Sequence, residues 1–224
     1  MTARMAGQGM IVSVLMMTAL WQTPARVRIV AMGDSTTAGT PAFKSPREMP
    51  PDGSGDVTSQ YAYWLMKTHP GWDVINQGVN AQRSDAIAAR LDEDVIAKKP
   101  AVVVIVAGVN DVYQGRPAQD VKDQLAAMYR RARAAGIAVV AGTIIPYNTA
   151  TPDQNARMQD VNAWIRAQAD GGVVTFADTR AAVAAPGDPD RLASSPDGLH
   201  PDAAGYHRMA DAIAPAIERA LKSR

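Results

Sequence analysis

The chain has 224 residues, with 23 Lys and Arg against 22 Asp and Glu, 47% hydrophobic residues and no cysteine. This length suits one ordinary domain, and the composition is that of a globular protein, so wholesale disorder is excluded. A formal net charge of +1 provides no electrostatic footprint for nucleic acid or an anionic membrane. The absence of cysteine excludes disulfides, thiolate metal sites and cysteine nucleophiles.

The first 25 residues have the pattern of an export signal. Residues 10–20 (MIVSVLMMTAL) form an apolar run, with Arg4 upstream and Thr23-Pro24-Ala25 downstream. As a helix this run would be about 16 Å long, too short for a ~30 Å hydrocarbon core, so no membrane span is predicted. We expect residues 1–25 to be a signal peptide and residues 26–224 to be the domain of an exported (periplasmic or secreted) protein. The alternative is an N-terminal helix packed on the domain of a cytoplasmic protein.

From residue 26 onward, apolar runs typical of strands alternate with helical patterns. The expected strands are Val27–Met32, Trp72–Gln77, Ala101–Ala107, Ile137–Ile145 and Val173–Phe176. The expected helices are Val57–His69, Arg83–Lys99 (with a break near Leu91), Pro117–Ala135, Asp153–Ala169 and Pro201–Leu221, and the longer loops are Thr40–Gly55 and Ala182–Ser195. The third strand is apolar at every position, which is typical of a parallel strand covered on both faces. The pattern predicts a single doubly wound, three-layer α/β/α domain with a five-stranded parallel sheet.

The residues that directly follow the strands are the first candidates for a functional site. In an open parallel sheet, ligands bind beyond the carboxyl ends of the strands, near the topological switch point. With the flavodoxin-like order 2-1-3-4-5, the first strand lies between the second and the third. Ser35 would then lie between Gly78 and Asn110, as a nucleophile between two oxyanion donors. Taken singly, Ser35 is explained as a helix N-cap and the other two as turn residues.

A serine nucleophile needs a neighbouring base, and that base needs an orienting group. His200 directly precedes the last expected helix and follows Asp197 by three residues. This Asp-x-x-His loop can supply both partners of a Ser-His-Asp triad. The other two histidines have simpler explanations, since His69 lies at a helix end and His207 lies within the last helix.

Four segments together resemble the SGNH (GDSL-type) hydrolase superfamily over residues 26–221. They are Gly33-Asp34-Ser35, Asn76-Gln77-Gly78, Gly108-Val109-Asn110-Asp111 and Asp197-Gly198-Leu199-His200-Pro201. The resemblance implies that Ser35 is the nucleophile, His200 the general base and Asp197 its orienter. It also implies an oxyanion hole made by the backbone N–H groups of Ser35 and Gly78 and the side chain of Asn110. No metal or cofactor is implied.

Other features of the sequence bear on this hypothesis. Ala81 departs from the pattern, because many members of the superfamily carry a second glycine there. Asp34 and Asp111 could be the carboxylate pair of a glycosidase, but each is better explained as a residue that fixes its own loop. P-loop, His-Glu-x-x-His, Gly-x-Gly-x-x-Gly and Gly-x-Ser-x-Gly motifs are all absent.

The implied activity is that of a serine esterase that works through an acyl-enzyme. Three loops expected near the site, Thr40–Gly55, Tyr113–Arg116 and Tyr147–Pro152, are polar, and no apolar lid is visible. We therefore expect short acyl esters as substrates, including O-acetyl groups on carbohydrate. A lysophospholipase or thioesterase acting on medium acyl chains, acyl transfer to a sugar, and a non-catalytic binding module of the same fold are the alternatives.

Overall fold

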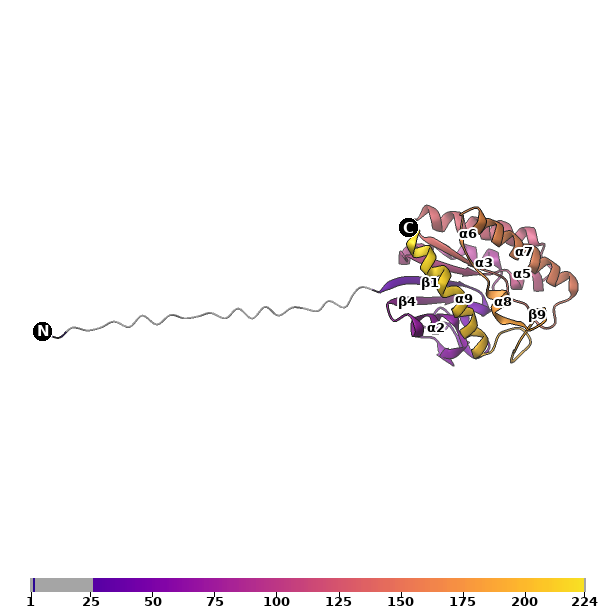
Figure 1. Ribbon diagram of the computed structural model, residues 1–224, viewed down its shortest axis with the longest axis horizontal. Coiled ribbons are helices and arrows are strands. Elements are labelled where there is room, and N and C mark those ends of the chain that lie inside the picture. Colours follow the sequence, from indigo (N-terminus) through magenta and orange to yellow (C-terminus); the bar gives the residue numbers. More distant parts are fainter. Residues whose placement is uncertain (1, 3–25, 224) are drawn as a thin grey trace.

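The computed structural model of the protein describes residues 26–223, together with residue 2. The expected signal peptide, residues 1–25, therefore lies outside the described residues except for that one position. Figure 1 shows a twisted sheet with helices on both of its faces.

The central sheet has five parallel strands in the order β4-β1-β5-β6-β7. In chain order these are β1 (Val27–Gly33), β4 (Trp72–Gly78), β5 (Val102–Val106), β6 (Ala138–Gly142) and β7 (Thr175–Ala177). The arrangement confirms the predicted order 2-1-3-4-5 and the doubly wound fold. All five residues of β5 are buried, as expected for a β-branched strand that is covered on both faces.

Nine α-helices and two short 3₁₀ helices connect these strands in the described part of the chain. They are α1 (Ser35–Ala38), η1 (Val57–Ser59), α2 (Tyr61–Thr68), α3 (Ser84–Ala89), α4 (Leu91–Asp94), η2 (Ile96–Lys98), α5 (Val109–Tyr113), α6 (Ala118–Ala134), α7 (Pro152–Asp170), α8 (Thr179–Val183) and α9 (Ala203–Lys222). None of the helices described is both long and apolar enough to cross a membrane.

Several boundaries differ from the predicted ones. The helix expected over residues 83–99 is three short helices, α3, α4 and η2, interrupted at Arg90 and Val95. The two expected loops each contain a small antiparallel hairpin. These hairpins are β2 (Phe43–Lys44) with β3 (Ser54–Gly55), and β8 (Ala184–Ala185) with β9 (Asp188–Leu192). Such short pairings carry no apolar pattern that would separate them from a loop.

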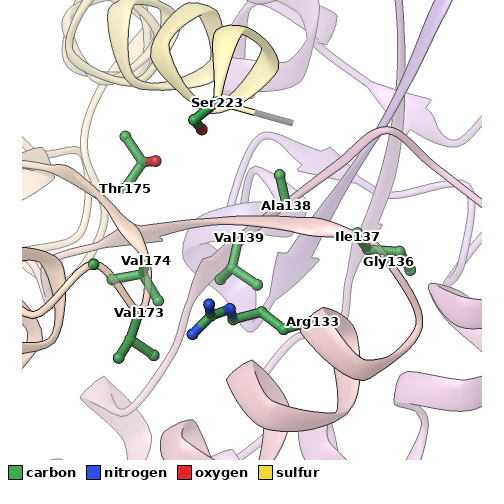
Figure 2. A pocket seen from close by; sticks show the side chains of 10 residues that line it. Arg133, Gly136, Ile137, Ala138, Val139, Val173, Val174, Thr175 and Ser223 are labelled. Atoms are coloured by element: carbon green, nitrogen blue, oxygen red, sulfur yellow. The ribbon is translucent and has the colours of Figure 1, made fainter.

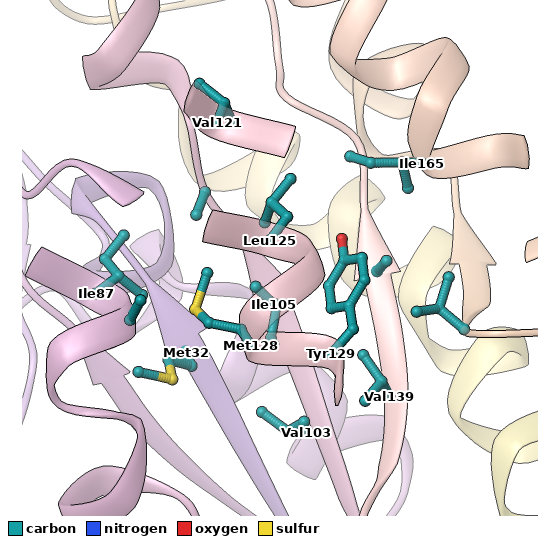
Figure 3. Packing of buried hydrophobic residues seen from close by; sticks show 14 of the residues in the cluster. Met32, Ile87, Val103, Ile105, Val121, Leu125, Met128, Tyr129, Val139 and Ile165 are labelled. Carbon is teal, nitrogen blue, oxygen red and sulfur yellow. The ribbon is translucent and has the colours of Figure 1, made fainter. Parts of the chain in front are cut away.

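Alternate residues of each strand enter two separate hydrophobic clusters. In β1, Val30 and Met32 pack with α3, α4, α6 and α7, whereas Ile29 and Ala31 pack with α2 and α9. Figure 3 shows the first cluster, where Met128 and Leu125 of α6 lie over the strands. Because both faces are covered by apolar side chains, the carboxyl edge of the sheet is left for polar residues.

Candidate active site

Ser35 lies at the carboxyl end of β1, as the first residue of the short helix α1. The helix begins there because the Oδ1 atom of Asp34 accepts a hydrogen bond from the Thr36 N–H group at 2.9 Å, as an N-cap does. The Ser35 side chain is buried, and its backbone N–H group has no partner among the described residues.

The structure brings Ser35, His200 and Asp197 together in one hydrogen-bonded chain. The Nε2 atom of His200 lies 2.8 Å from Ser35 Oγ, and its Nδ1 atom lies 2.7 Å from Asp197 Oδ2. The loop that carries both residues is fixed by its own contacts. The other Asp197 oxygen accepts from the N–H groups of Leu199 and His200, and the Ser195 hydroxyl donates to the His200 carbonyl at 2.6 Å.

These contacts also set the charge of the carboxylate behind the histidine. Partial burial alone would raise the pKa of Asp197, but the hydrogen bonds from the His200 ring and from the N–H groups of Leu199 and His200 lower that pKa below its ordinary value. An ionised Asp197 accepts a hydrogen bond from the Nδ1–H group, which leaves the unprotonated Nε2 atom free to take a proton from Ser35 Oγ.

Asn110 lies in α5, directly after β5, and contacts the loop that follows β4. Its Nδ2 atom donates to the Gln82 carbonyl at 2.9 Å, which leaves the second amide proton unused. The neighbouring Asp111 accepts from the Ser84 N–H and hydroxyl groups, both at 2.8 Å, and so caps α3. Burial raises the pKa of Asp111 despite these two bonds. The pair therefore joins α5 to the loop over residues 79–82.

Gly78 occupies a different place from the one expected of an oxyanion donor. Its N–H group already donates to Asn76 Oδ1 at 2.9 Å, and the residue does not line the cavity beside Ser35. A Cβ atom at this position would overlap the backbone of Ala38 and Thr37 in α1. The glycine therefore permits α1 to pack on the end of β4.

Ala81 is the residue of this loop that faces the candidate site. It lines the cavity, its N–H group has no partner among the described residues, and its φ angle is 61°. This left-handed conformation is the one that glycine adopts most easily, so the alanine side chain strains the backbone here.

The cavity beside Ser35 has a volume of about 180 Å³. Ten residues line it: Ser35, Thr36, Asn80, Ala81, Val109, Asn110, Tyr113, Tyr147, Leu199 and His200. Tyr113 and Tyr147 pack edge to face on one side, with ring centroids 5.8 Å apart. Two of the three loops expected at the site edge thus contribute to the cavity, whereas residues 40–55 do not line it.

A larger cavity of about 610 Å³ lies at the opposite, amino end of β6 and β7 (Figure 2). Apart from Arg133 and the hydroxyls of Thr175 and Ser223, its lining has no charged or hydroxyl side chain. It holds no base that could activate either hydroxyl. The smaller cavity beside Ser35 is therefore the candidate active site.

The remaining titratable candidates have structural roles. The His69 ring stacks on Trp72 with ring centroids 3.9 Å apart, and the His207 ring stacks on Trp64 with ring centroids 4.1 Å apart. Neither histidine contacts Ser35. Asp34 fixes its own turn, as expected, because it accepts from Thr36 at the start of α1. Asp111 instead holds a different segment, since it accepts from the N–H and hydroxyl groups of Ser84 at the start of α3. No cluster of three or more metal-ligating side chains occurs in the part of the chain that the structure describes.

Comparison with known proteins places the chain in a family of hydrolases. The model of the GDSL-like Lipase/Acylhydrolase family matches residues 31–208. None of the curated proteins matches the chain.

Several solved structures share the fold. A GDSL-like lipase from Bacteroides thetaiotaomicron is 28% identical, with a TM-score of 0.70 over 87% of this chain and 89% of that chain. TesA is 24% identical, with a TM-score of 0.68 over 87% of this chain and 99% of that chain. An acetylxylan esterase from Geobacillus stearothermophilus is 22% identical, with a TM-score of 0.66 over 88% of this chain and 94% of that chain.

The packing role of Gly78 predicts the effect of adding one methyl group. We expect Gly78→Ala to lower the free energy of unfolding by about 1–3 kcal/mol or more, because the new Cβ meets backbone atoms that cannot move aside easily. Gly71→Ala is the matched control, since no atom lies within 4 Å of its added Cβ. Urea unfolding of both variants checks this, and equal stabilities would contradict it.

Asp34 predicts a pH dependence of stability. Burial raises its pKa from 3.8 to about 7, although hydrogen bonds from Thr36 act against the shift. Between these two pH values the folded protein keeps a proton that the unfolded chain has lost. The free energy of unfolding of the wild type therefore falls as the pH rises from about 4 to about 7. Asp34→Asn removes this dependence, and its stability relative to wild type should rise from pH 4 to pH 7.

The exposed helix cap Asp56 provides the control for this measurement. Hydrogen bonds from Thr58 lower the pKa of Asp56, which is the opposite direction of shift from that of Asp34. The stability of Asp56→Asn relative to wild type should therefore not rise from pH 4 to pH 7. Urea unfolding from pH 4 to pH 7 measures these differences. If the free energy of unfolding of Asp34→Asn relative to wild type does not change with pH, Asp34 is already ionised and the prediction is wrong.

Proposed function

The chain belongs to the GDSL-like lipase and acylhydrolase family, and we propose that it is a serine esterase that hydrolyses short acyl esters. The observation that carries the proposal is the hydrogen-bonded chain from Ser35 through His200 to Asp197, beside a small cavity. O-acetyl groups on carbohydrate are one substrate class that fits, and the fold is shared with an acetylxylan esterase.

In the proposed mechanism, Ser35 Oγ attacks the ester carbonyl carbon while Nε2 of His200 takes the hydroxyl proton. The carbonyl π electrons move to the oxygen, and the ionised Asp197 stabilises the imidazolium. Collapse of the tetrahedral intermediate breaks the ester C–O bond, and His200 gives its proton to the departing alcohol. A water molecule then attacks the acyl-enzyme with His200 as base, which releases the acid and restores Ser35.

The developing oxyanion needs donors that are in place before the reaction. We assign the Ser35 N–H group and the unused Nδ2 proton of Asn110 to this role. The Ala81 N–H group takes the place first expected for Gly78, because Ala81 lines the cavity and its N–H group has no partner, whereas the Gly78 N–H group is held by Asn76.

The size of the cavity favours a short acyl group. A volume of about 180 Å³ corresponds to about six water-sized groups at roughly 30 Å³ each. An acetyl or butyryl group fits within this space, whereas a medium-chain acyl group would have to extend past Tyr113 into solvent. The lysophospholipase or thioesterase alternative would therefore place part of its acyl chain outside this cavity.

Export of the protein is a further part of the proposal. The apolar run at residues 10–20 behind Arg4 supports a signal peptide that is removed after Ala25. The mass of the protein recovered from the periplasm or the medium tests this. We expect the mature chain to begin at Arg26, and an intact N-terminus would contradict export by cleavage.

Loss of the nucleophile should abolish the activity. We expect wild type to hydrolyse p-nitrophenyl esters with a rate maximum at or below C4, and Ser35→Ala to be inactive on all of them. Fluorophosphonate should label wild type and not the variant. A rate maximum at C8 or longer would favour the medium-chain alternative, and an unlabelled wild type would favour a binding module.

Removal of one oxyanion donor should slow the chemical step. We expect Asn110→Ala to lower kcat by about 10²–10³-fold, the typical cost of one such donor, with a smaller change in KM. Steady-state kinetics on p-nitrophenyl acetate measure this. Gln114→Ala is the control, since Gln114 follows α5 and contacts Arg83 rather than the cavity. An unchanged kcat in Asn110→Ala would remove this residue from the mechanism.

A further inference from the structure

Arg90 is a buried arginine beneath the candidate site, at the break between α3 and α4. Its guanidinium donates to the carbonyl oxygens of Gly33 and Gln77, both at 2.7 Å. It also donates to the side-chain oxygen of Gln82 at 2.7 Å and to Asp94 at 2.6 Å. These bonds use four of its five N–H donors. One planar cation therefore joins the end of β1, the end of β4 and the loop after β4.

Two of these contacts, to Gly33 and Gln82, lie close to a proposed oxyanion donor. Gly33 precedes Asp34 and Ser35 directly, and its carbonyl also accepts from the Val79 N–H group at 3.2 Å. Gln82 follows Ala81 directly, and its backbone carbonyl holds the Nδ2 atom of Asn110. Arg90 therefore binds the residue that follows Ala81 and the residue two positions before Ser35.

Stability alone is a weak reason to keep a charge at this position. Burial lowers the pKa of Arg90, although the bond to Asp94 counteracts the shift. Desolvation of such a pair offsets much of its attraction, and apolar replacements of buried ion pairs are often neutral or stabilising. What an apolar side chain cannot supply is a rigid fork that fixes two carbonyl groups and an amide oxygen at once.

We propose that Arg90 is a positioning residue that holds the N–H groups of Ser35 and Ala81 and the amide of Asn110 in the geometry of an oxyanion hole. The inference rests on the proposed function. Arg90 touches no substrate, since it does not line the cavity. Its effect is to fix the separation of donors that come from three different segments of the chain.

The test compares Arg90→Lys and Arg90→Ala with wild type on p-nitrophenyl acetate. Lysine keeps the charge but cannot bridge the carbonyl groups in a plane. Since a lost donor costs about 10²–10³-fold, we expect displaced donors to lower kcat by about 10- to 100-fold in Arg90→Lys, with KM changed less than threefold. Rates are divided by the fraction of chains that fluorophosphonate labels at completion, which removes misfolded protein from the comparison.

Two further measurements separate positioning from a structural role. Guanidinium ion at millimolar concentration should restore part of the kcat of Arg90→Ala and leave Arg90→Lys unchanged, because only alanine leaves room for it. Arg180→Lys is the matched control. Arg180 is equally buried and is bound to Asn155 and Asp190 at the end of the sheet near β7, and it does not line the cavity beside Ser35. We expect this control to lose stability but to keep its kcat.

The kcat values of the variants test the role of Arg90, whereas the activity of wild type tests the proposed function. A wild-type kcat in Arg90→Lys, with only a lower Tm, would overturn the positioning role and leave the esterase proposal intact. An equal fall of kcat in Arg180→Lys would also overturn it, because any buried arginine would then suffice. If wild type neither hydrolyses esters nor reacts with fluorophosphonate, the proposed function itself fails.

Discussion

The candidate site depends on the close approach of α1 to the neighbouring strand ends. Gly78 allows the backbone of α1 to rest on β4, and Gly33 allows the turn after β1 to lie against β5, where a Cβ atom would overlap the Val106 carbonyl. A side chain at either position would push Ser35 away from the sheet edge. Ser35, the proposed nucleophile, is thus placed by two residues that have no side chain, and its polar partners lie around it.

A buried polar layer lies directly beneath Ser35. Asp34 has one oxygen bound to Thr36 and one without a partner among the described residues, and the Arg90 side chain is buried. Such groups are costly in a hydrophobic domain unless they are hydrogen-bonded. Their presence here, in a fold whose two cores are otherwise apolar, matches the general trade of stability for a fixed geometry at functional sites.

The sequence allowed the sheet order and the meeting of Ser35, His200 and Asp197 to be predicted, because apolar runs mark buried strands and parallel strands end at one edge. It did not show that the N–H group of Gly78 is held by Asn76, because that bond exists only in the folded turn, and the proposal therefore uses the N–H group of Ala81 instead. It did not single out Arg90, although an arginine between the buried Ile87 and Leu91 was a usable signal. The hairpins were missed because two-residue pairings leave no periodic pattern.

The hydrogen bond between Ser35 and His200 joins residues 165 positions apart in the chain. Synthesis delivers the serine with the first strand, but the imidazole arrives only with the loop before the last helix, and α9 must pack against α2 and the sheet to hold that loop in place. A partly synthesised chain therefore contains Ser35 without Asp197 and His200. In the proposed mechanism such a chain has no base for the serine, so ester hydrolysis requires the last loop and α9 to be in place.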